Sequence, residues 1–201
     1  MPRVKQRTPE LRDRLLAVAV DLLARQGVTG FTTRTLAREA GTSPPAVYEL
    51  FGDKSGVVRE VYFEGFRLLR GRLGALVDTD DPRGDLVRLA QLYRRFMVDN
   101  PVLGELMFSR PFTDFDPAPS EVAASGSVRT FVVDHVARAV EVGVLAGDAT
   151  DIAHVFIGLV QGLAAAERAG RLGTTRTSVE RRWALGVDRL LAGLAPGSAG
   201  P

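Results

Sequence analysis

The stretch Gly41–Phe51, GTSPPAVYELF, decides how the rest of the sequence is interpreted, because it places two consecutive prolines among good helix formers. A proline inside a helix removes a backbone hydrogen bond, but the N–H groups of a first helical turn have no partner within the helix. Ser43 is a favourable N-cap residue, which puts Pro44 and Pro45 at the first two helical positions. The prolines therefore predict the start of a short helix over residues 44–51.

A second short helix is predicted just before this one, over residues 33–40, and residues 41–43 form the turn between them. Two short helices joined by a three-residue turn that contains glycine are typical of a helix-turn-helix. Ala37 and Val47 lie where such a pair packs closely. A generic helical hairpin is the alternative, because spacing alone does not separate the two.

The remaining sequence also predicts helices, with no alternating β-branched run that would indicate a strand. We therefore expect an all-α fold with an N-terminal three-helix helix-turn-helix domain at residues 1–53, a C-terminal helical domain at 54–195 and a disordered tail at 196–201. The helices are predicted over residues 8–26, 33–40, 44–51, 54–77, 83–99, 101–109, 120–145, 150–169 and 177–194.

Composition argues against several classes of protein. The chain has no cysteine, and its two histidines, His135 and His154, lie on different predicted helices without the spacing of a metal site. No phosphate-binding glycine loop or nucleophile elbow is present. We therefore expect no enzyme activity, no catalytic residues, no metal and no cofactor.

Location and charge give weaker indications. The N-terminus lacks the apolar core of a signal peptide, and the uncharged run at residues 152–166 is shorter than the roughly 18–20 residues that a membrane span needs. We expect a cytoplasmic protein with no membrane partner. Residues 1–60 carry ten lysines and arginines against seven aspartates and glutamates, which mildly favours a polyanionic partner near the N-terminus.

A family resemblance becomes clear over residues 27–62, GVTGFTTRTLAREAGTSPPAVYELFGDKSGVVREVY. A Thr-Thr pair precedes the first short helix, an Ala-Gly pair opens the turn, and a lysine follows Phe51 by three residues. With these features the segment from about residue 9 to 63 resembles the N-terminal domain of TetR-family transcriptional regulators. The resemblance implies a homodimer that binds a palindromic operator in double-stranded DNA.

The same resemblance implies roles for particular side chains. The start of the first short helix would take a phosphate, and Arg34 would reach a guanine edge, which suits its planar guanidinium. Tyr48 and Lys54 match positions that contact phosphates, which set affinity and register without reading sequence. The implied DNA-binding residues are Thr32, Thr33, Arg34, Thr42, Ser43, Pro45, Ala46, Tyr48 and Lys54.

Five of these residues also have a structural alternative. Thr33 and Ser43 can be helix caps only, and Arg34 can be a solvated helix charge. Tyr48 can pack at the edge of the core, and Lys54 can cap a helix or form a salt bridge. The prolines lack N–H groups. The helix over residues 44–51, which would be the recognition helix, is therefore expected to offer Pro45 and Ala46 as apolar contacts to a thymine methyl.

The C-terminal half carries aromatic and methionine side chains that usually form a core but could line an apolar cavity. Residues 89–111 and 154–170 are similar to a TetR ligand-domain subtype named for a Trp…His-Gly motif, although Phe156 and Gln161-Gly162 stand at those places here. The resemblance favours a cavity for a small apolar effector. Its predicted lining is Phe66, Tyr93, Phe96, Met107, Phe108, Phe131, His135 and Gln161.

The last two predicted helices are candidates for a dimer interface. Residues 152–166 are apolar nearly all round, more than one core face needs, and Trp183 would be an anchor on the final helix. Packing within one chain is the alternative. The sequence thus predicts a homodimeric, sequence-specific DNA-binding regulator, specifically a repressor released by its effector. The other possibilities are a helical small-molecule-binding protein without a DNA-binding role and an enzyme with an unrecognised site.

Overall fold

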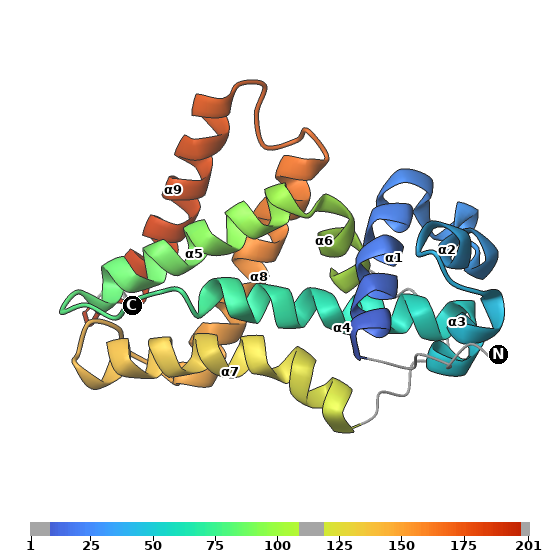
Figure 1. Ribbon diagram of the computed structural model, residues 1–201. Coiled ribbons are helices and arrows are strands. Elements are labelled where there is room, and N and C mark those ends of the chain that lie inside the picture. Colours follow the sequence, from blue (N-terminus) through green and yellow to red (C-terminus); the bar gives the residue numbers. More distant parts are fainter. Residues whose placement is uncertain (1–8, 109–118, 198–201) are drawn as a thin grey trace. The chain divides into compact units, whose positions relative to one another are not determined.

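The computed structural model describes residues 9–108 and 119–197 (Figure 1). Within these ranges the chain forms helices and no strand, which confirms the predicted all-α fold. Residues 198–201 of the predicted tail lie outside the described residues. The helices are α1 (Pro9–Gly30), α2 (Thr33–Glu39), α3 (Pro44–Phe51), α4 (Lys54–Leu73), α5 (Pro82–Asp99), α6 (Pro101–Phe108), α7 (Pro119–Glu141), α8 (Ala149–Arg168) and α9 (Arg176–Gly193).

Three predicted helix ends differ from the structure. The backbone leaves the helical conformation at Gly27, as predicted, but one more turn follows before α1 ends. The helix predicted over 54–77 ends at Leu73, because the residues after it form a connection that binds α5 and α7. The helix predicted over 120–145 ends at Glu141, where the N–H groups of Val144 and Leu145 turn back to the Ala139 carbonyl.

The chain divides into two compact units, which we describe separately. The first comprises the described residues within Met1–Gly65 and Pro101–Phe115, and the second those within Phe66–Asn100 and Asp116–Pro201. The helix α4 contributes residues to both units. The domain boundary placed between residues 53 and 54 stays a prediction.

In the first unit, α1 packs against α2 and α6, and α2 packs against α3. The side chains of Leu15, Phe31, Leu36 and Val47 are fully buried between these helices. Burial of such side chains contributes on the order of 1.5–3 kcal/mol each, so the apolar core fixes the small helices that would not be stable alone.

A close backbone approach sets the corner between α3 and α4. The side chain of Asp53 accepts a hydrogen bond from the Gly56 N–H at 2.8 Å, which caps the start of α4. A Cβ atom at Gly56 would lie 1.8 Å from the Phe51 carbonyl oxygen. Only glycine fits there without moving the backbone.

In the second unit, α8 packs against α7, α5 and α9. It buries Ile152, Ala153, Phe156 and Val160. Yet only 22% of its most apolar stretch of 18 residues is buried. It is also the helix in the described part of the chain that is long and apolar enough to cross a membrane by length and composition. A helix with this composition and so little burial leaves an apolar face that the single chain does not cover.

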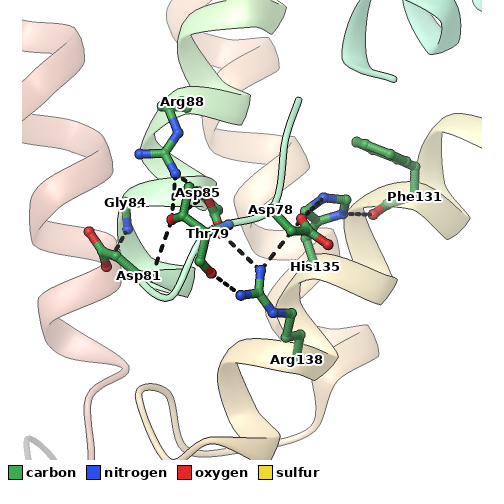
Figure 2. Close-up of polar contacts among 9 residues, drawn as sticks. All are labelled: Asp78, Thr79, Asp81, Gly84, Asp85, Arg88, Phe131, His135 and Arg138. Carbon is green, nitrogen blue, oxygen red and sulfur yellow. Dashed lines mark hydrogen bonds and ion pairs between the residues drawn. The ribbon is translucent and has the colours of Figure 1, made fainter. Parts of the chain in front are cut away.

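A polar cluster fastens the α4–α5 connection to α7 (Figure 2). Its centre is Asp85, which is 1% exposed. The carboxylate accepts hydrogen bonds from the Thr79 N–H at 3.0 Å, from the Thr79 hydroxyl at 3.1 Å and from Arg138 at 2.8 Å, and it also pairs with Arg88. Arg138 in turn donates to the Thr79 carbonyl oxygen. A buried carboxylate is therefore fully provided with donors and cations.

The cluster predicts a pH-dependent contribution to stability. Burial alone would raise the pKa of Asp85, but the hydrogen bonds from Thr79 and Arg138 and the charge of Arg88 outweigh it and hold that pKa below its ordinary value. The ionised carboxylate thus stabilises the fold above its unfolded-state pKa of about 3.9, and the contribution is lost as pH falls through the lower folded-state pKa.

We expect Asp85→Asn to lower the free energy of unfolding at pH 7 by about 2 kcal/mol, because a buried charge-assisted network loses its acceptor. The difference from the unmodified protein should shrink below about pH 4, where the unfolded chain takes up the proton. Urea denaturation across this pH range measures it, with the exposed Asp80→Asn in the same connection as control. A difference that stays constant with pH would contradict this role of the charge.

Candidate DNA-binding surface and ligand domain

The start of α2 is capped by Thr32. This residue has an extended backbone (φ −134°, ψ 147°), and its side-chain oxygen accepts a hydrogen bond from the Thr35 N–H at 3.1 Å. The Thr32 hydroxyl also lies 2.9 Å from that of Thr35. The cap lies at an exposed helix N-terminus, where the helix dipole favours an anion.

Thr33 has a different environment from its neighbour. Its side chain is buried, and its hydroxyl donates to the Tyr48 hydroxyl oxygen at 3.1 Å. This bond joins α2 to α3 and holds the tyrosine, whose side chain is 50% exposed. Tyr48 therefore combines a fixed hydroxyl with an accessible ring.

Ser43 occupies the N-cap position of α3, with φ −105° and ψ 150°, but its side chain makes no capping hydrogen bond. The reason lies in the two prolines. A capping side chain bonds to the N–H of the second or third helical residue. Pro45 has none, and the Ala46 N–H donates to the Ser43 carbonyl oxygen at 3.0 Å. Ser43 thus has the backbone conformation of the expected cap, but its exposed hydroxyl forms no capping hydrogen bond.

The turn itself depends on Gly41, which adopts a positive φ of 65°. Glycine reaches this conformation more easily than other residues, because it has no Cβ atom. The Gly41 N–H donates to the Arg38 carbonyl oxygen and the Thr42 N–H to that of Ala37 at 2.9 Å. The sharp reversal brings α3 back against α2 directly after the turn.

The predicted DNA-binding residues all lie in the first unit, on α2, the turn, α3 and the first residue of α4. Arg34 and Pro45 are exposed, whereas Thr42, Ala46 and Lys54 are partly exposed. Thr33 is the buried member of the set. The structure thus places most of the predicted side chains at the surface of one small, tightly built module.

The predicted effector-binding residues divide between the units. Met107 and Phe108 belong to the first unit, where Met107 is buried and Phe108 is 41% exposed. The other six belong to the second unit. Phe66, Tyr93 and Phe96 are buried there, and burial raises the pKa of the Tyr93 hydroxyl.

His135 is held by neighbours that the sequence did not indicate. Its Nδ1 lies 2.7 Å from the Phe131 carbonyl oxygen, and its Nε2 lies 3.2 Å from an Asp78 carboxylate oxygen (Figure 2). The rings of Phe131 and His135 are 4.2 Å apart, and the Arg70 guanidinium lies 4.1 Å from the centre of the Phe131 ring. Gln161 is partly exposed on α8. No group of three or more residues among those described could hold a metal ion.

Two short helices joined by a glycine turn form a helix-turn-helix, a motif found in many DNA-binding proteins. Residues 15–61 match the family profile described as bacterial regulatory proteins, tetR family, and residues 86–190, more than half of the chain, match the tetracyclin repressor-like C-terminal domain. The chain belongs to the TetR family of transcriptional regulators.

Solved structures share this fold. A protein of unknown function from Rhodococcus sp. RHA1 is 29% identical, with a TM-score of 0.82 over 96% of this chain and 100% of that chain. The TetR-family regulator PfmR from Thermus thermophilus is 22% identical, with a TM-score of 0.69 over 90% and 99%. A TetR variant from Acinetobacter baumannii AYE in complex with minocycline is 18% identical, with a TM-score of 0.63 over 89% and 93%. The last two similarities show the fold alone. No curated protein sequence matches this chain significantly.

The family assignment makes the chain a DNA-binding transcriptional regulator with a ligand-binding domain. The resemblance to the Trp…His-Gly subtype stays a prediction.

The capping geometry predicts unequal effects of two similar substitutions. Thr32→Ala should lower the free energy of unfolding by about 1 kcal/mol, because it removes a side-chain cap. Ser43→Ala should change it by less than about 0.5 kcal/mol, because no cap is lost. Urea denaturation measures both. Equal losses would show that the Ser43 hydroxyl caps α3 in solution.

Proposed function

We propose that the chain is a homodimeric, cytoplasmic repressor that binds a palindromic DNA operator and is released from it by a small apolar effector. The observation that carries the DNA-binding part is the module formed by α2, the turn and α3. This module exposes Arg34, Pro45 and Tyr48, and buried contacts fix its helix pair.

The proposed recognition of the DNA sequence follows from the backbone N–H groups that are missing at the start of α3. Pro44 and Pro45 occupy its first two positions, so neither offers an N–H to a phosphate or a base. Base-specific hydrogen bonding then falls to Arg34 on α2, whose planar guanidinium suits the O6 and N7 acceptors of guanine. Pro45 and Ala46 supply apolar contact, and Tyr48 and Lys54 bind phosphates.

The dimer is proposed from the uncovered apolar surface of the last two helices. Val155 on α8 and Leu185 on α9 are 56% and 53% exposed. A Cβ atom at Gly158 or Gly162 on α8 would meet nothing within 4 Å, so these positions leave room for another helix. A second copy would cover this surface and give the two recognition helices that a palindromic operator requires.

The effector is proposed to bind among the aromatic side chains of the ligand-binding domain. Support comes from the buried Phe66, Tyr93 and Phe96 and from Phe131 beside His135. The similar Acinetobacter baumannii protein was solved with minocycline, a small molecule. The roles of Met107, Phe108 and Gln161 rest on the family resemblance.

Release would follow from linkage between the two sites. An effector that binds one conformation of the ligand-binding domain better than another shifts the population by its differential affinity. We propose α4 as the connecting element, because its first residue is Lys54 and its last part belongs to the second unit. Operator affinity then falls by the same coupling free energy.

Selection of an operator from random DNA duplexes tests this function. Arg34→Ala should cost about 1–3 kcal/mol on the selected operator and relax its sequence preference at one position of each half-site. Lys54→Ala should weaken binding to all duplexes alike and reduce the slope of log affinity against log salt by about 1. Fluorescence anisotropy over a salt series measures both effects.

The control is Arg129→Ala, which removes an exposed arginine of α7 in the second unit. It should leave operator affinity unchanged. If no palindromic sequence is selected, and if neither Arg34→Ala nor Lys54→Ala affects DNA binding, the repressor proposal is wrong. A small-molecule-binding protein without a DNA-binding role then becomes the better explanation.

A further inference from the structure

A groove lies within the second unit between α5 and α9, which meet where Arg83 binds Asp188 and diverge toward the start of α9 (Figure 1). Its volume is about 770 Å³, within the range of about 300–1,000 Å³ typical of small-molecule sites. The predicted effector-binding residues do not line it. It is therefore separate from the cavity that the family resemblance implies.

The walls of the groove combine apolar and charged side chains, and the apolar ones come from both helices. On α5 they include Val87 and Ala90, and on α9 they include Trp183, Ala184 and Val187. Ala184 is exposed, whereas Trp183 is buried with its edge at the groove. Such a surface suits the hydrocarbon part of a ligand.

A rigid polar network forms one part of the lining. The Nε and Nη2 atoms of Arg94 each donate to a different carboxylate oxygen of Glu167 at 2.8 Å, and the Trp183 indole N–H donates to the same carboxylate at 2.6 Å. The hydrogen bond to Glu167 raises the pKa of Arg94, and the hydrogen bond from Arg94 lowers the pKa of Glu167. The bidentate pair leaves further N–H donors of the guanidinium unused by Glu167.

The groove lining holds three arginines and three carboxylates, but one of these carboxylates pairs with an arginine outside the lining. Each of its three acidic residues has an arginine partner: Asp99 pairs with Arg72, Glu167 with Arg94, and Glu180 with Arg176, all at 2.8 Å. The remaining cation of the lining is Arg95, which is exposed and forms no ion pair with a residue in the described ranges. Among the described residues, the groove lining thus holds one guanidinium that forms no ion pair.

We propose that this groove is a second small-molecule site, which binds an amphipathic monocarboxylate. Its hydrocarbon part lies along Val87, Ala184 and Val187, and its carboxylate pairs with Arg95, where an arginine fork is suited to a carboxylate. The site depends on neither DNA binding nor the apolar effector, so it can be tested on the free protein.

The chain contains one tryptophan, Trp183, and it borders the groove, so its fluorescence reports on this site. Titration of the full-length protein with decanoate, below its micelle concentration, should change the tryptophan emission saturably. Isothermal titration calorimetry should give one molecule per chain. The neutral probe 1-decanol should bind more weakly by roughly tenfold, because it forms no ion pair with Arg95.

Two variants locate the binding. Arg95→Gln should weaken decanoate binding about tenfold, whereas the matched control Arg181→Gln, an exposed arginine of α9 outside the groove, should leave it unchanged. Ala184→Phe should reduce binding by filling the groove, with an unchanged circular dichroism spectrum as evidence of folding.

The proposal is overturned if decanoate does not bind, as would happen if a second copy of the chain covered the groove. It is also overturned if decanoate binds without changing Trp183 emission, or if Arg95→Gln and Ala184→Phe bind it as tightly as the unmodified protein. Equal affinity for decanoate and 1-decanol would contradict the carboxylate specificity. Failure of any of these tests leaves the repressor proposal intact, since no DNA is involved.

Discussion

The packing of α2 against α3 is the constraint on which the DNA-binding surface depends. Leu36 and Val47 are fully buried at this contact, and the turn between the helices closes only because Gly41 adopts φ 65°. The Thr33 hydroxyl then reaches Tyr48 and joins the two helices by a polar contact as well. Since α3 begins immediately after the turn, the position of every exposed side chain on it is set by these few buried atoms.

In the second unit, a buried charge supplements the apolar core. Asp85 is enclosed by Thr79, Arg88 and Arg138, so the short connection after α4 is tied to both α5 and α7. A buried carboxylate is costly unless all its acceptor sites are used, and a connection that meets this condition has little freedom to adopt another conformation. Any movement of the end of α4 would therefore either break the hydrogen bonds of this cluster or move the cluster as well.

Much of the fold could be predicted because helix starts and ends are local signals. The Ser-Pro-Pro sequence at Pro44 and the glycine after α2 are examples, and the structure agrees with both. The signal at Gly27 marks a break in the helical backbone, although α1 continues to Gly30. The Asp85 cluster could not be predicted, since Arg138 lies far from it in sequence and a charged residue at one helix position gives no sign of its distant partner. Likewise the absent Ser43 cap depends on where the Ala46 N–H points, which sequence alone does not reveal.

The uncovered apolar face of α8 connects the structure to the proposed function. Two copies of the chain packed on this face would place two helix-turn-helix modules on one operator. Val155→Arg tests this most directly, with Val142→Arg as a control of matched exposure, 57% against 56%. Analytical ultracentrifugation should show a folded monomer for Val155→Arg, with operator affinity lost, and an unaltered dimer for Val142→Arg. A Val155→Arg protein that stays dimeric, or a monomer that binds the operator as tightly as the unmodified protein, would contradict the proposed dimer.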